Sequence, residues 1–513
     1  MINADLIIAE TYRGLTKFLC DPVISTAEEL GYELFAVGGC VRDPLLGRSI
    51  GDIDLAVVGD AIELAEQVAR RARIDKQALY RRFGTALVHF RGVNLEFAAA
   101  RRESYSPDSR KPSEVQLVDI EQDLLRRDFT INALALALTG PRQGQLLDLF
   151  GGREDLSEGL IRTPGEPGRT FADDPLRMLR AVRFAAELGF QIEPQTWEGL
   201  KDSIPRLEIV AAERIGDEFW KMLAGHDPVR AMQLLIDSGL MNLILPEVID
   251  MAGVEQVGRH HHKDVLAHSL KVLQNVAERT PDPVVRLAGL LHDVGKPRTK
   301  HFDRELGWTF HGHDALGAKM TRRLGRRLKI GKEDLERLTR LVQLHMRPIN
   351  LTDEGVTDSA IRRMMAESGK YLDDQLILCR ADITSANPDK VQRYLATFDE
   401  MVSRMGDVQA RDRMRNFQSP LRGDEIIQLL NLEPGPVVGA LKEEIEDAIL
   451  DGVIPFDRDA AREYLFRIKD KIISKDSEAI AQERRIRAQS RRRIKGDFKF
   501  PEIAELNEEG LPK

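Results

Sequence analysis

The sequence has few cysteines and no excess of positive charge. Its three cysteines, Cys20, Cys40 and Cys379, are odd in number and far apart, which argues against a disulfide framework and a cysteine zinc site. A reducing cytoplasm is therefore the predicted compartment. The net charge of −8 argues against a protein that coats nucleic acid through charge alone, so any such contact must be local.

Long apolar runs are also missing. None approaches the roughly 20 residues that a membrane-spanning helix needs. Residues 1–19 are interrupted by Asp5, Glu10, Arg13 and Lys17, which predicts an amphipathic helix rather than a secretory signal. With 42% hydrophobic and 31% charged residues, the composition is that of a globular protein. A chain of 513 residues exceeds one hydrophobic core and predicts about three or four domains.

The coarse pattern changes along the chain. From about residue 33 to 150, helical stretches alternate with short β-rich runs, which predicts a mixed α/β region. These runs are residues 34–37, 53–58, 86–90 and 95–99. The segment SYSPDSRKPSE at residues 104–114 predicts a mobile loop inside that region. Most of the remaining chain has apolar residues at helical spacing, as in RMLRAVRFAAELGF, and shows no internal repeat.

The first local signal is LFAVGGCVRDPLLGRSIGDIDLAVVG at residues 34–59. A strand ends in Gly38 and Gly39, which lets backbone amides approach a phosphate, and the N-terminus of the next helix favours an anion. Arg42 adds a positive charge. An ordinary tight turn contains the same pair of glycines, so the pair alone does not decide the function.

Two aspartates follow the glycine pair. Asp52 and Asp54 are two residues apart, and on a strand such residues face the same side. Clustered carboxylates repel one another unless a cation lies between them. Mg²⁺ prefers such oxygen ligands and completes its coordination shell with substrate phosphates. Glu96, in VNLEFA, is a candidate third carboxylate. A solvated strand end is the alternative interpretation for all three.

Five motifs occur in a specific order between residues 38 and 190: GGCVRD, GDIDLAV, LRRDFTINALAL, LLDLFGGREDL and FADDPLRMLRAVRFAAELGF. In this order they resemble the class II tRNA nucleotidyltransferase and bacterial poly(A) polymerase family. The resemblance implies an α+β fold class, with a DNA polymerase β-like head followed by an all-α neck. It also implies addition of C and A residues to the 3′ end of tRNA, using CTP and ATP.

The resemblance assigns roles to individual residues. Asp52 and Asp54 match the catalytic carboxylates that hold Mg²⁺, with Glu96 as a third candidate. One departure concerns Asp173, where relatives often have Glu. The positions predicted to bind the nucleotide are Gly38, Gly39, Arg42, Arg127, Asp128, Asn132, Asp174, Arg177 and Arg180.

Three of these residues bear on the choice of base. Asp174, Arg177 and Arg180 are spaced by three, which predicts that they share one helix face. A carboxylate accepts from an exocyclic amino group and a guanidinium donates to ring acceptors, so the protein itself can recognise C or A. An exposed ion pair has the same spacing and is the alternative.

A second set of motifs begins after Arg259: HHHKDVLAHSL, LAGLLHDVGKPR, FHGHDALGAK, LVQLHMRP and LCRADITSANP. They resemble an HD-domain phosphohydrolase. Such mixed imidazole and carboxylate ligands suit Mn, Fe, Ni, Zn or Mg. His313 and His345 lie where relatives with a second metal have further ligands. The histidine run at residues 260–262 is interpreted as a solvated turn and is not included among the ligands. The sequence does not decide whether His311 is a ligand. The residues predicted to converge on a divalent cation are His268, His292, Asp293 and Asp382.

Two features mark the C-terminal part. Residues 421–454 resemble the small helical module of many HD-bearing tRNA nucleotidyltransferases, with PGPVVG as a tight turn between helices that meet the tRNA body. The run RRIRAQSRRRIKGDFK at residues 484–499 is suited to phosphates through counterion release. A solvated charged tail is an equal alternative, because no aromatic residues are interleaved for stacking on bases.

Together these patterns predict four domains. They are a nucleotidyltransferase head at 1–150, a helical neck with the base-recognising and RNA-binding segment at 151–245, an HD domain at 246–400 and a helical tRNA-binding tail at 401–513. We expect CCA addition to tRNA, Mg²⁺ in the head, a transition metal such as Ni, Mn, Fe or Zn in the HD domain, and no membrane partner. The alternatives are a poly(A) polymerase, an enzyme that adds only A or only CC, or HD phosphohydrolysis as the main activity.

Overall fold

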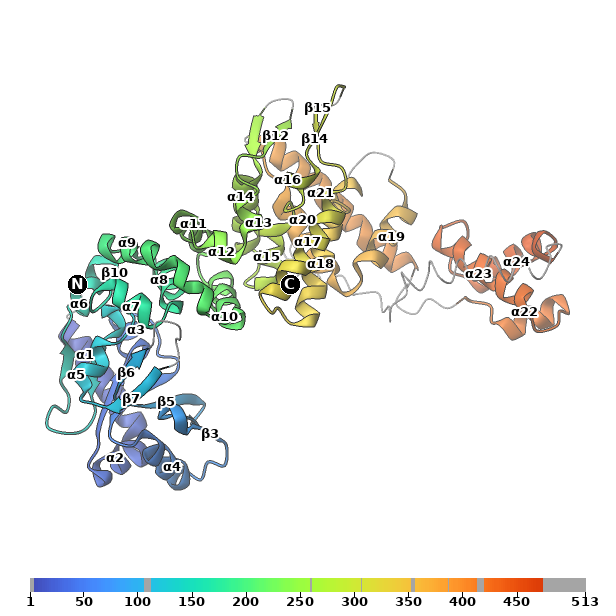
Figure 1. Cartoon of the computed structure of the whole chain (residues 1–513). Helices are drawn as coiled ribbons and strands as arrows, with labels where there is room; N and C mark the ends of the chain where they lie inside the picture. The colour runs from blue at the N-terminus through green and yellow to red at the C-terminus, as the bar shows by residue number, and fades with distance from the viewer. Residues whose placement is uncertain are drawn as a thin grey trace. The chain divides into compact units, whose positions relative to one another are not determined.

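The computed structural model describes residues 4–105, 112–258, 261–305, 307–351, 356–385, 387–412 and 419–473. The basic run at 484–499 and the start of the histidine run at 259–260 lie outside these residues. The chain forms two compact units, Met1–Pro246 and Glu247–Lys513 (Figure 1). The first unit begins with helix α1 (Ala4–Leu19), at the position of the predicted amphipathic helix. No helix in the described part of the chain combines the length and apolarity needed to cross a membrane.

A seven-stranded mixed sheet organises the first unit, with strand order β3-β4-β5-β2-β1-β8-β9. Neighbouring strands are antiparallel except for β2 and β5, which run parallel. The four predicted β-rich runs form β1, β2, β4 and β5, which confirms the mixed α/β interpretation. The strands are β1 (Glu33–Val37), β2 (Ile53–Val58), β3 (Gln77–Tyr80), β4 (Thr85–Phe90), β5 (Val93–Ala99), β8 (Leu134–Ala137) and β9 (Leu146–Asp148).

One face of this sheet is covered and part of the other is open. Helix α4 (Ala61–Ala72) buries Leu64 and Val68 and packs against β4 and β5. Side chains along β4 alternate between buried and exposed, as the two-residue period of a strand requires. Glu96 of β5 is exposed, and its register partner on β4, Leu87, is exposed as well. The open face therefore presents Glu96 to solvent.

The central part of the segment predicted as a mobile loop, residues 106–111, lies outside the described residues, and the two ends of the segment form an antiparallel strand pair. Strand β6 (Arg101–Tyr105) pairs with β7 (Pro112–Leu117), and the register shifts at the end of the pair, between Ser104 and Tyr105. Ser-, Pro- and charge-rich composition favours turns, but pairing of the two flanks satisfies their backbone groups. Proline has no N–H to donate to the ladder, which fits the irregular register at its end.

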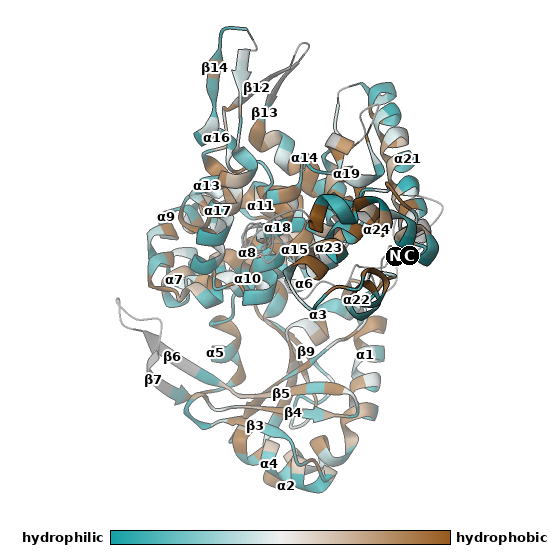
Figure 2. Cartoon of the chain, turned by 90° about the vertical axis from the view of Figure 1, so that its right-hand side faces the viewer, coloured by the Kyte–Doolittle hydropathy of each residue, from teal (hydrophilic) through white to brown (hydrophobic). Residues whose placement is uncertain are grey.

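Apart from a short parallel strand pair, β10 (Leu160–Ile161) with β11 (Gln191–Ile192), the remaining elements described in the first unit are helices. They include α5 (Ile120–Leu125), α7 (Pro167–Asp173), α8 (Leu176–Leu188), α9 (Pro194–Ser203), α10 (Ala212–Ala224) and α11 (Pro228–Ser238). Helix α8 buries Met178, Leu179 and Val182 and packs against α10 and α11. Most helices of the chain have both hydrophilic and hydrophobic residues along their length (Figure 2), as expected for helices with one buried face.

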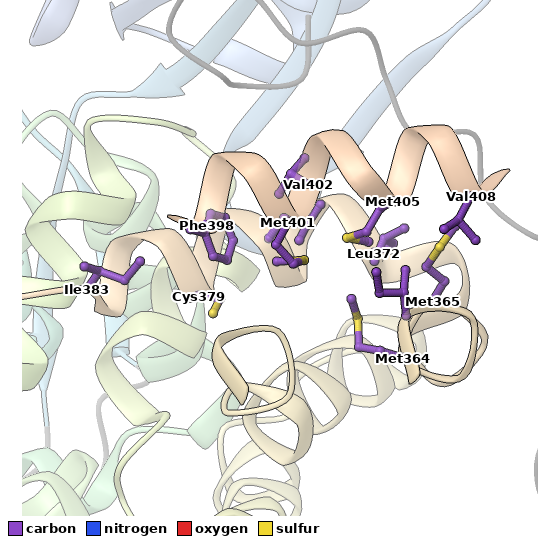
Figure 3. Packing of buried hydrophobic residues seen from close by; sticks show 12 residues of the cluster. Met364, Met365, Leu372, Cys379, Ile383, Phe398, Met401, Val402, Met405 and Val408 are labelled. Carbon is purple, nitrogen blue, oxygen red and sulfur yellow. The ribbon is translucent and has the colours of Figure 1, made fainter. Parts of the chain in front are cut away.

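In the described part of the second unit, the elements other than two short hairpins are helices. The hairpins are β12 (Glu255–Gly258) with β13 (His261–Asp264) and β14 (His301–Asp303) with β15 (Gly307–Thr309). Helices α19 to α21 share a core that includes Met365, Leu372, Phe398 and Met405 (Figure 3). The main helices are α14 (Val265–Ala277), α15 (Pro283–Leu291), α17 (His313–Arg327), α18 (Lys332–Leu344), α19 (Asp358–Ser368), α20 (Leu372–Asp382) and α21 (Pro388–Asp412).

The last three helices have their own core. They are α22 (Gly423–Leu430), α23 (Pro436–Leu450) and α24 (Arg458–Ile473), with Leu441 and Leu465 fully buried between them. Helix α22 ends at Asn431, which has a φ of 48°. Only the first two residues of PGPVVG lie in the turn, because Pro436 already begins α23, a position where the fixed φ of proline suits a helix.

Candidate active site and metal centre

The three predicted catalytic carboxylates lie together at the edge of the β2–β5 pair. Asp54 of β2 is the register partner of Glu96 on β5, and Asp52 immediately precedes β2. Burial, followed by the negative charge of Glu96, raises the pKa of Asp54 to about 6, although Arg127 acts in the opposite direction. Burial accounts for the largest part of this rise, and the contributions of Glu96 and Asp52 show that the three carboxylates lie close enough to repel one another, as they would around a shared divalent cation.

The predicted glycine turn approaches these carboxylates closely. Gly38 has a φ of 69° and a ψ of −130° and directly precedes helix α3 (Gly39–Leu45). A Cβ on Gly38 would lie 3.3 Å from Oδ2 of Asp54 and 3.8 Å from Nη1 of Arg127. Glycine is therefore required here both by the backbone conformation and by the space beside Asp54.

Arg42 is buried rather than presented to solvent. Its Nη1 donates to Oδ1 of Asn132 at 2.7 Å, and its Nε donates to Oδ1 of Asp43 at 2.8 Å. Asn132 in turn donates to Oδ1 of Asp128 at 3.0 Å, and Nε of Arg180 donates to Oδ2 of Asp128 at 2.7 Å. Four of the predicted nucleotide-binding residues thus form one hydrogen-bonded chain. That Arg42 holds a triphosphate stays a prediction.

Asp128 is the centre of this chain. Its burial raises the pKa, but the charge of Arg180 and the hydrogen bond from Asn132 outweigh burial and lower the pKa to about 2. Asp128 is therefore ionised throughout the neutral range and orders the side chains on both sides of it.

A cleft of about 400 Å³ opens beside these residues. Arg127, Asp128, Asp174, Arg177 and Arg180 line it, so the structure brings five predicted residues to one cavity. Arg127 also borders the Gly38 turn, and the charges of Arg127 and Arg180 both act on Asp54. The cleft therefore adjoins the carboxylate cluster. Charged residues of the cleft that the sequence prediction missed are Arg126 and, on one face of α10, Arg214, Asp217, Glu218 and Lys221.

Asp174 does not share a helix with the two arginines, which corrects the prediction of a common face. It lies between α7 and α8 in an extended conformation, with φ −139° and ψ 101°. The next residue is Pro175, and a residue before proline is sterically driven out of the helical region. The Asp174 carboxylate accepts from the backbone N–H of Leu176 at 3.2 Å and lies 3.8 Å from Nη2 of Arg214.

Arg177 is fixed by backbone carbonyls. Its Nη1 donates to the carbonyl of Thr170 at 3.2 Å, and its Nη2 donates to the carbonyl of Arg126 at 2.5 Å. One guanidinium thus joins α7 to the end of α5 at the wall of the cleft. Base recognition by Arg177 stays a prediction. The sequence did not indicate that two backbone carbonyls hold this guanidinium in place.

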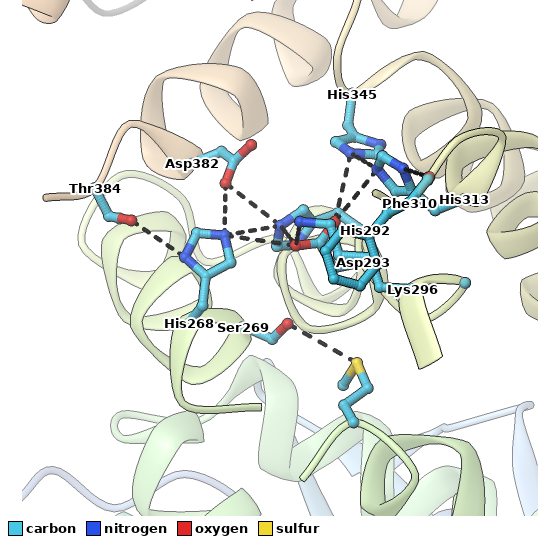
Figure 4. Close-up of polar contacts among 12 residues, drawn as sticks. His268, Ser269, His292, Asp293, Lys296, Phe310, His313, His345, Asp382 and Thr384 are labelled. Atoms are coloured by element: carbon cyan, nitrogen blue, oxygen red, sulfur yellow. Dashed lines mark hydrogen bonds and ion pairs between the residues drawn. The ribbon is translucent and has the colours of Figure 1, made fainter. Parts of the chain in front are cut away.

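In the second unit, the six predicted metal-ligating side chains form two adjoining triads (Figure 4). His268, His292 and Asp382 make the first, with their ligand atoms within 4.8 Å of one another. Nε2 of His268 lies 2.9 Å from Oδ1 of Asp382, and Nε2 of His292 lies 3.4 Å from the same oxygen.

Asp293 joins the first triad to the second, which consists of Asp293, His313 and His345. Its Oδ2 lies 3.2 Å from Nε2 of His292. Its Oδ1 lies 3.5 Å from Nε2 of His313 and 3.8 Å from Nε2 of His345. One carboxylate therefore faces both groups, an arrangement suited to two neighbouring cations. His311 is exposed and belongs to neither triad.

Backbone carbonyls orient three of the imidazoles. A carbonyl only accepts, so the Nδ1 atom beside it holds the proton, and the lone pair of Nε2 points into the centre. For His268 the partner of Nδ1 is the hydroxyl of Thr384, at 3.1 Å. The carbonyl contacts are His292 to Gly289 at 2.9 Å, His313 to Phe310 at 2.9 Å and His345 to Val342 at 2.8 Å.

The charges at this centre are strongly coupled. Burial raises the pKa of Asp293, but the charges of His292 and Lys296 outweigh it and hold the pKa well below its usual range. Lys296 lies 2.6 Å from Oδ2 of Asp293. Burial and the charge of His292 lower the pKa of His345 to about 4, so its Nε2 lone pair is available at neutral pH. The ionised form of Asp293 and the neutral form of His345 are the states that metal ligands require. Burial lowers the pKa of His292, but the charges of Asp293 and Asp382 outweigh burial and raise that pKa to about 10, so a cation bound here would replace a proton of this imidazole.

Comparisons with known proteins agree with a nucleotidyltransferase head in the first unit and an HD domain in the second. Family models for the poly A polymerase head domain, the probable RNA- and SrmB-binding site of polymerase A and the HD domain match residues 34–162, 189–251 and 265–387. The CCA-adding enzyme of Leuconostoc mesenteroides is 30% identical over 451 residues, which are 86% of this chain and 96% of that protein. The chain belongs to the tRNA nucleotidyltransferase and poly(A) polymerase family.

Another relative of this nucleotidyltransferase is named as an A-adding enzyme, and several similar proteins have solved structures. The A-adding tRNA nucleotidyltransferase of Deinococcus radiodurans is 36% identical over 340 residues, 64% of this chain and 75% of that protein. The Bacillus stearothermophilus CCA-adding enzyme in complex with CTP is 25% identical with a TM-score of 0.57, covering 88% of this chain and 96% of that one. The Thermotoga maritima CCA-adding enzyme complexed with tRNA has the same fold, with a TM-score of 0.58 and 22% identity over 89% and 96% of the chains.

These findings confirm the predicted family and fold class. The nucleotidyltransferase has a polymerase β-like head, helical regions and an HD domain, and its HD match spans the two triads of metal-ligating residues. The roles of individual residues and the domain boundaries drawn from the sequence stay predictions.

Proposed function

We propose that this nucleotidyltransferase completes the 3′ CCA end of tRNA by adding C and A residues from CTP and ATP. The observation that carries the proposal is the cleft of acidic and arginine side chains adjoining the carboxylates of β2 and β5. The names of its relatives supply the substrate, since several of them are CCA-adding enzymes. The three free cysteines fit action in a reducing cytoplasm.

In the head, one group of residues would hold the metal and another would bind the triphosphate. Asp52, Asp54 and Glu96 would hold Mg²⁺, which when bound supplies positive charge to the phosphates and to the attacking 3′-hydroxyl. The raised pKa of Asp54 fits such a site, because burial and then the negative charge of Glu96 disfavour its ionised form, and a bound cation would offset both. Gly39 and Arg127 bind the triphosphate beside the Gly38 turn, and the buried Arg42 supports them with its charge.

The residues of the cleft hold the ribose and the base. Asp128 and Asn132 form a fixed polar edge for the ribose. Asp174 accepts from the exocyclic amino group that C and A share, while Arg177 and Arg180 donate to ring acceptors. Arg177 is already held by two backbone carbonyls, so the cleft offers a fixed guanidinium and not a flexible one.

Incorporation assays test this function directly. Transcripts of tRNA ending at the discriminator base, after C and after CC are each incubated with one labelled nucleoside triphosphate. We expect C on the first two substrates and A on the third. Addition of A alone to the CC end would identify an A-adding enzyme, repeated A would identify a poly(A) polymerase, and C additions alone would identify a CC-adding enzyme. No incorporation on any transcript would refute the proposal.

We further propose that the HD domain is a metal-dependent phosphohydrolase. The supporting observation is the pair of adjoining triads, in which Asp293 of the second triad also contacts His292 of the first and has Lys296 beside it. His268, His292 and Asp382 would hold one cation and His313 and His345 the other; a bound transition metal such as Ni, Mn, Fe or Zn supplies a water of lowered pKa.

Both activities are measured on one preparation. The second assay uses nucleoside 2′,3′-cyclic phosphate and nucleoside 2′-phosphate with each metal in turn. We expect Asp293→Asn to remove hydrolysis and to spare nucleotide addition, because the carboxylates of the head lie in the other unit. Loss of nucleotide addition in a folded Asp293→Asn protein would assign the HD centre to the first active site. No hydrolysis by the wild type with any metal would refute the phosphohydrolase.

A further inference from the structure

The hairpin β14–β15 exposes two aromatic rings. Phe302 and Trp308 are register partners on its two strands, so their side chains share one face. Their ring centroids are 5.2 Å apart and their planes cross at 71°. Phe302 is nevertheless 56% exposed and Trp308 39% exposed. The hairpin therefore offers aromatic surface to the solvent.

Both ends of this hairpin are anchored at the metal centre. Before β14, helix α16 (Lys296–Thr299) begins with Lys296, whose Nζ pairs with Asp293. After β15, the carbonyl of Phe310 orients His313, and the ring of Phe310 lies 5.7 Å from Nζ of Lys296 (Figure 4). Trp308 is two residues from Phe310, which along a strand is about 7 Å. The aromatic pair is thus a short length of chain away from Phe310, whose carbonyl and ring contact His313 and Lys296 at the border of the HD centre.

A positive charge accompanies the rings. Nζ of Lys300 lies 4.6 Å from the centroid of the Trp308 ring, and the adjacent His301 is exposed. Aromatic rings next to cations are the surface on which nucleic-acid bases stack while their phosphates are neutralised.

Stabilisation of the hairpin alone does not account for this exposure. A cross-strand aromatic pair does strengthen a two-stranded ribbon. A pair that serves only packing is buried, as in Phe129 and Phe184, which meet edge to face while being 0% and 6% exposed. Phe302 and Trp308 make the same type of contact and leave much of their surface in water, where apolar area is unfavourable without a ligand.

We propose that the β14–β15 hairpin is a base-stacking platform for the substrate of the HD centre. The ligand class is a nucleoside phosphate, free or at the end of an RNA strand, with its base on Trp308 and Phe302 and its phosphoester at the triads. Trp308 is a specificity-determining residue for base-bearing substrates. The inference rests on the proposed phosphohydrolase function and adds the requirement for a base.

A binding experiment tests the platform without any need for turnover. The full chain has three tryptophans, so the double variant Trp197→Phe, Trp220→Phe leaves Trp308 as the sole emitter. With Mn²⁺ present, adenosine 2′-monophosphate should quench this emission saturably, and ribose 5-phosphate should not. A short RNA with a terminal 2′,3′-cyclic phosphate distinguishes the strand end from the free nucleotide. Quenching by neither base-bearing ligand would overturn the platform.

Hydrolysis provides the second test. For Trp308→Ala and Phe302→Ala, kcat/KM for adenosine 2′-monophosphate should fall about 10-fold, the size that loss of one stacked base supports. Hydrolysis of the base-free glycerol 2-phosphate should be unchanged, which also controls for folding. Trp308→Tyr should retain most of the activity.

The matched control is Tyr394→Ala, which removes another half-exposed ring beside a lysine, on α21. It should leave both substrates unaffected. Equal loss for base-bearing and base-free substrates in Trp308→Ala would mean that the hairpin is structural, and the platform would be wrong while the phosphohydrolase stands. Quenching without hydrolysis under any metal would keep the platform and refute the phosphohydrolase.

Discussion

Replacing Asp128 by asparagine should destabilise the first unit in a pH-dependent way. The carboxylate is buried and accepts hydrogen bonds from Arg180 at 2.7 Å and from Asn132 at 3.0 Å. Burial opposes its charge, yet these partners lower its pKa from 3.8 to about 2. An asparagine keeps the shape but leaves the Arg180 guanidinium without its charged partner.

The size of the effect follows from the pKa. A difference of about two units between the unfolded and folded pKa corresponds to about 2 kcal/mol of stability. Because the folded pKa is the lower one, this stability is present above pH 4 and is lost as the pH falls toward 2. The wild type should therefore exceed Asp128→Asn by about 2 kcal/mol at pH 7, and the difference should shrink at pH 4 and pH 3.

Unfolding in urea measures this difference for one unit at a time. In a Trp308→Phe background the remaining tryptophans, Trp197 and Trp220, both lie in the first unit, so fluorescence follows that unit alone. Asp75→Asn, which changes an exposed aspartate of the same unit, is the control and should have little effect at any pH. A difference for Asp128→Asn that stays constant from pH 7 to pH 3 would refute the electrostatic reasoning.

Three further changes have distinct expected results. Asp54→Asn should abolish nucleotide incorporation with no loss of thermal stability, since it removes a cation ligand from a carboxylate cluster; near wild-type incorporation would contradict that role. Arg177→Ala should blur the choice among CTP, ATP, GTP and UTP more than it weakens triphosphate binding, and unchanged preference in competition assays would place base recognition elsewhere. Thr384→Val should lower the affinity of the HD centre for Mn²⁺ by about 10- to 100-fold, because the hydroxyl orients His268, whereas Thr384→Ser should bind normally. Equal metal titrations for the valine and serine variants would show that the hydroxyl has no orienting role.

Much of the head could be predicted because its signals are local. The period of two in the runs around Asp54 and Glu96 was enough to place both carboxylates on strands. Their register, with Asp54 opposite Glu96, depends on a parallel pairing between segments about 40 residues apart that no local pattern specifies. Asp174 was misplaced because spacing was followed past Pro175, although the proline itself favours an extended residue before it.

Tertiary partners account for what the sequence could not indicate. The motif around Arg42 indicates a cation near the glycine turn, but it does not indicate that this side chain is buried against Asn132, which lies 90 positions away in the sequence. Likewise the motif HDVGK identifies Asp293 as a ligand, but it does not indicate that this carboxylate lies between the two triads and faces both. That sharing depends on α17 and α18 bringing His313 and His345 to the opposite oxygen.

The three carbonyl contacts of the HD histidines have a consequence for metal exchange. Each imidazole bonds to the residue three positions before it, so the direction of its coordinating nitrogen is set within one turn of backbone. Orientation of these ligands therefore does not depend on an ion being present. Loading and release then need little rearrangement of the protein, and a centre of this kind takes up whichever suitable divalent ion its surroundings supply.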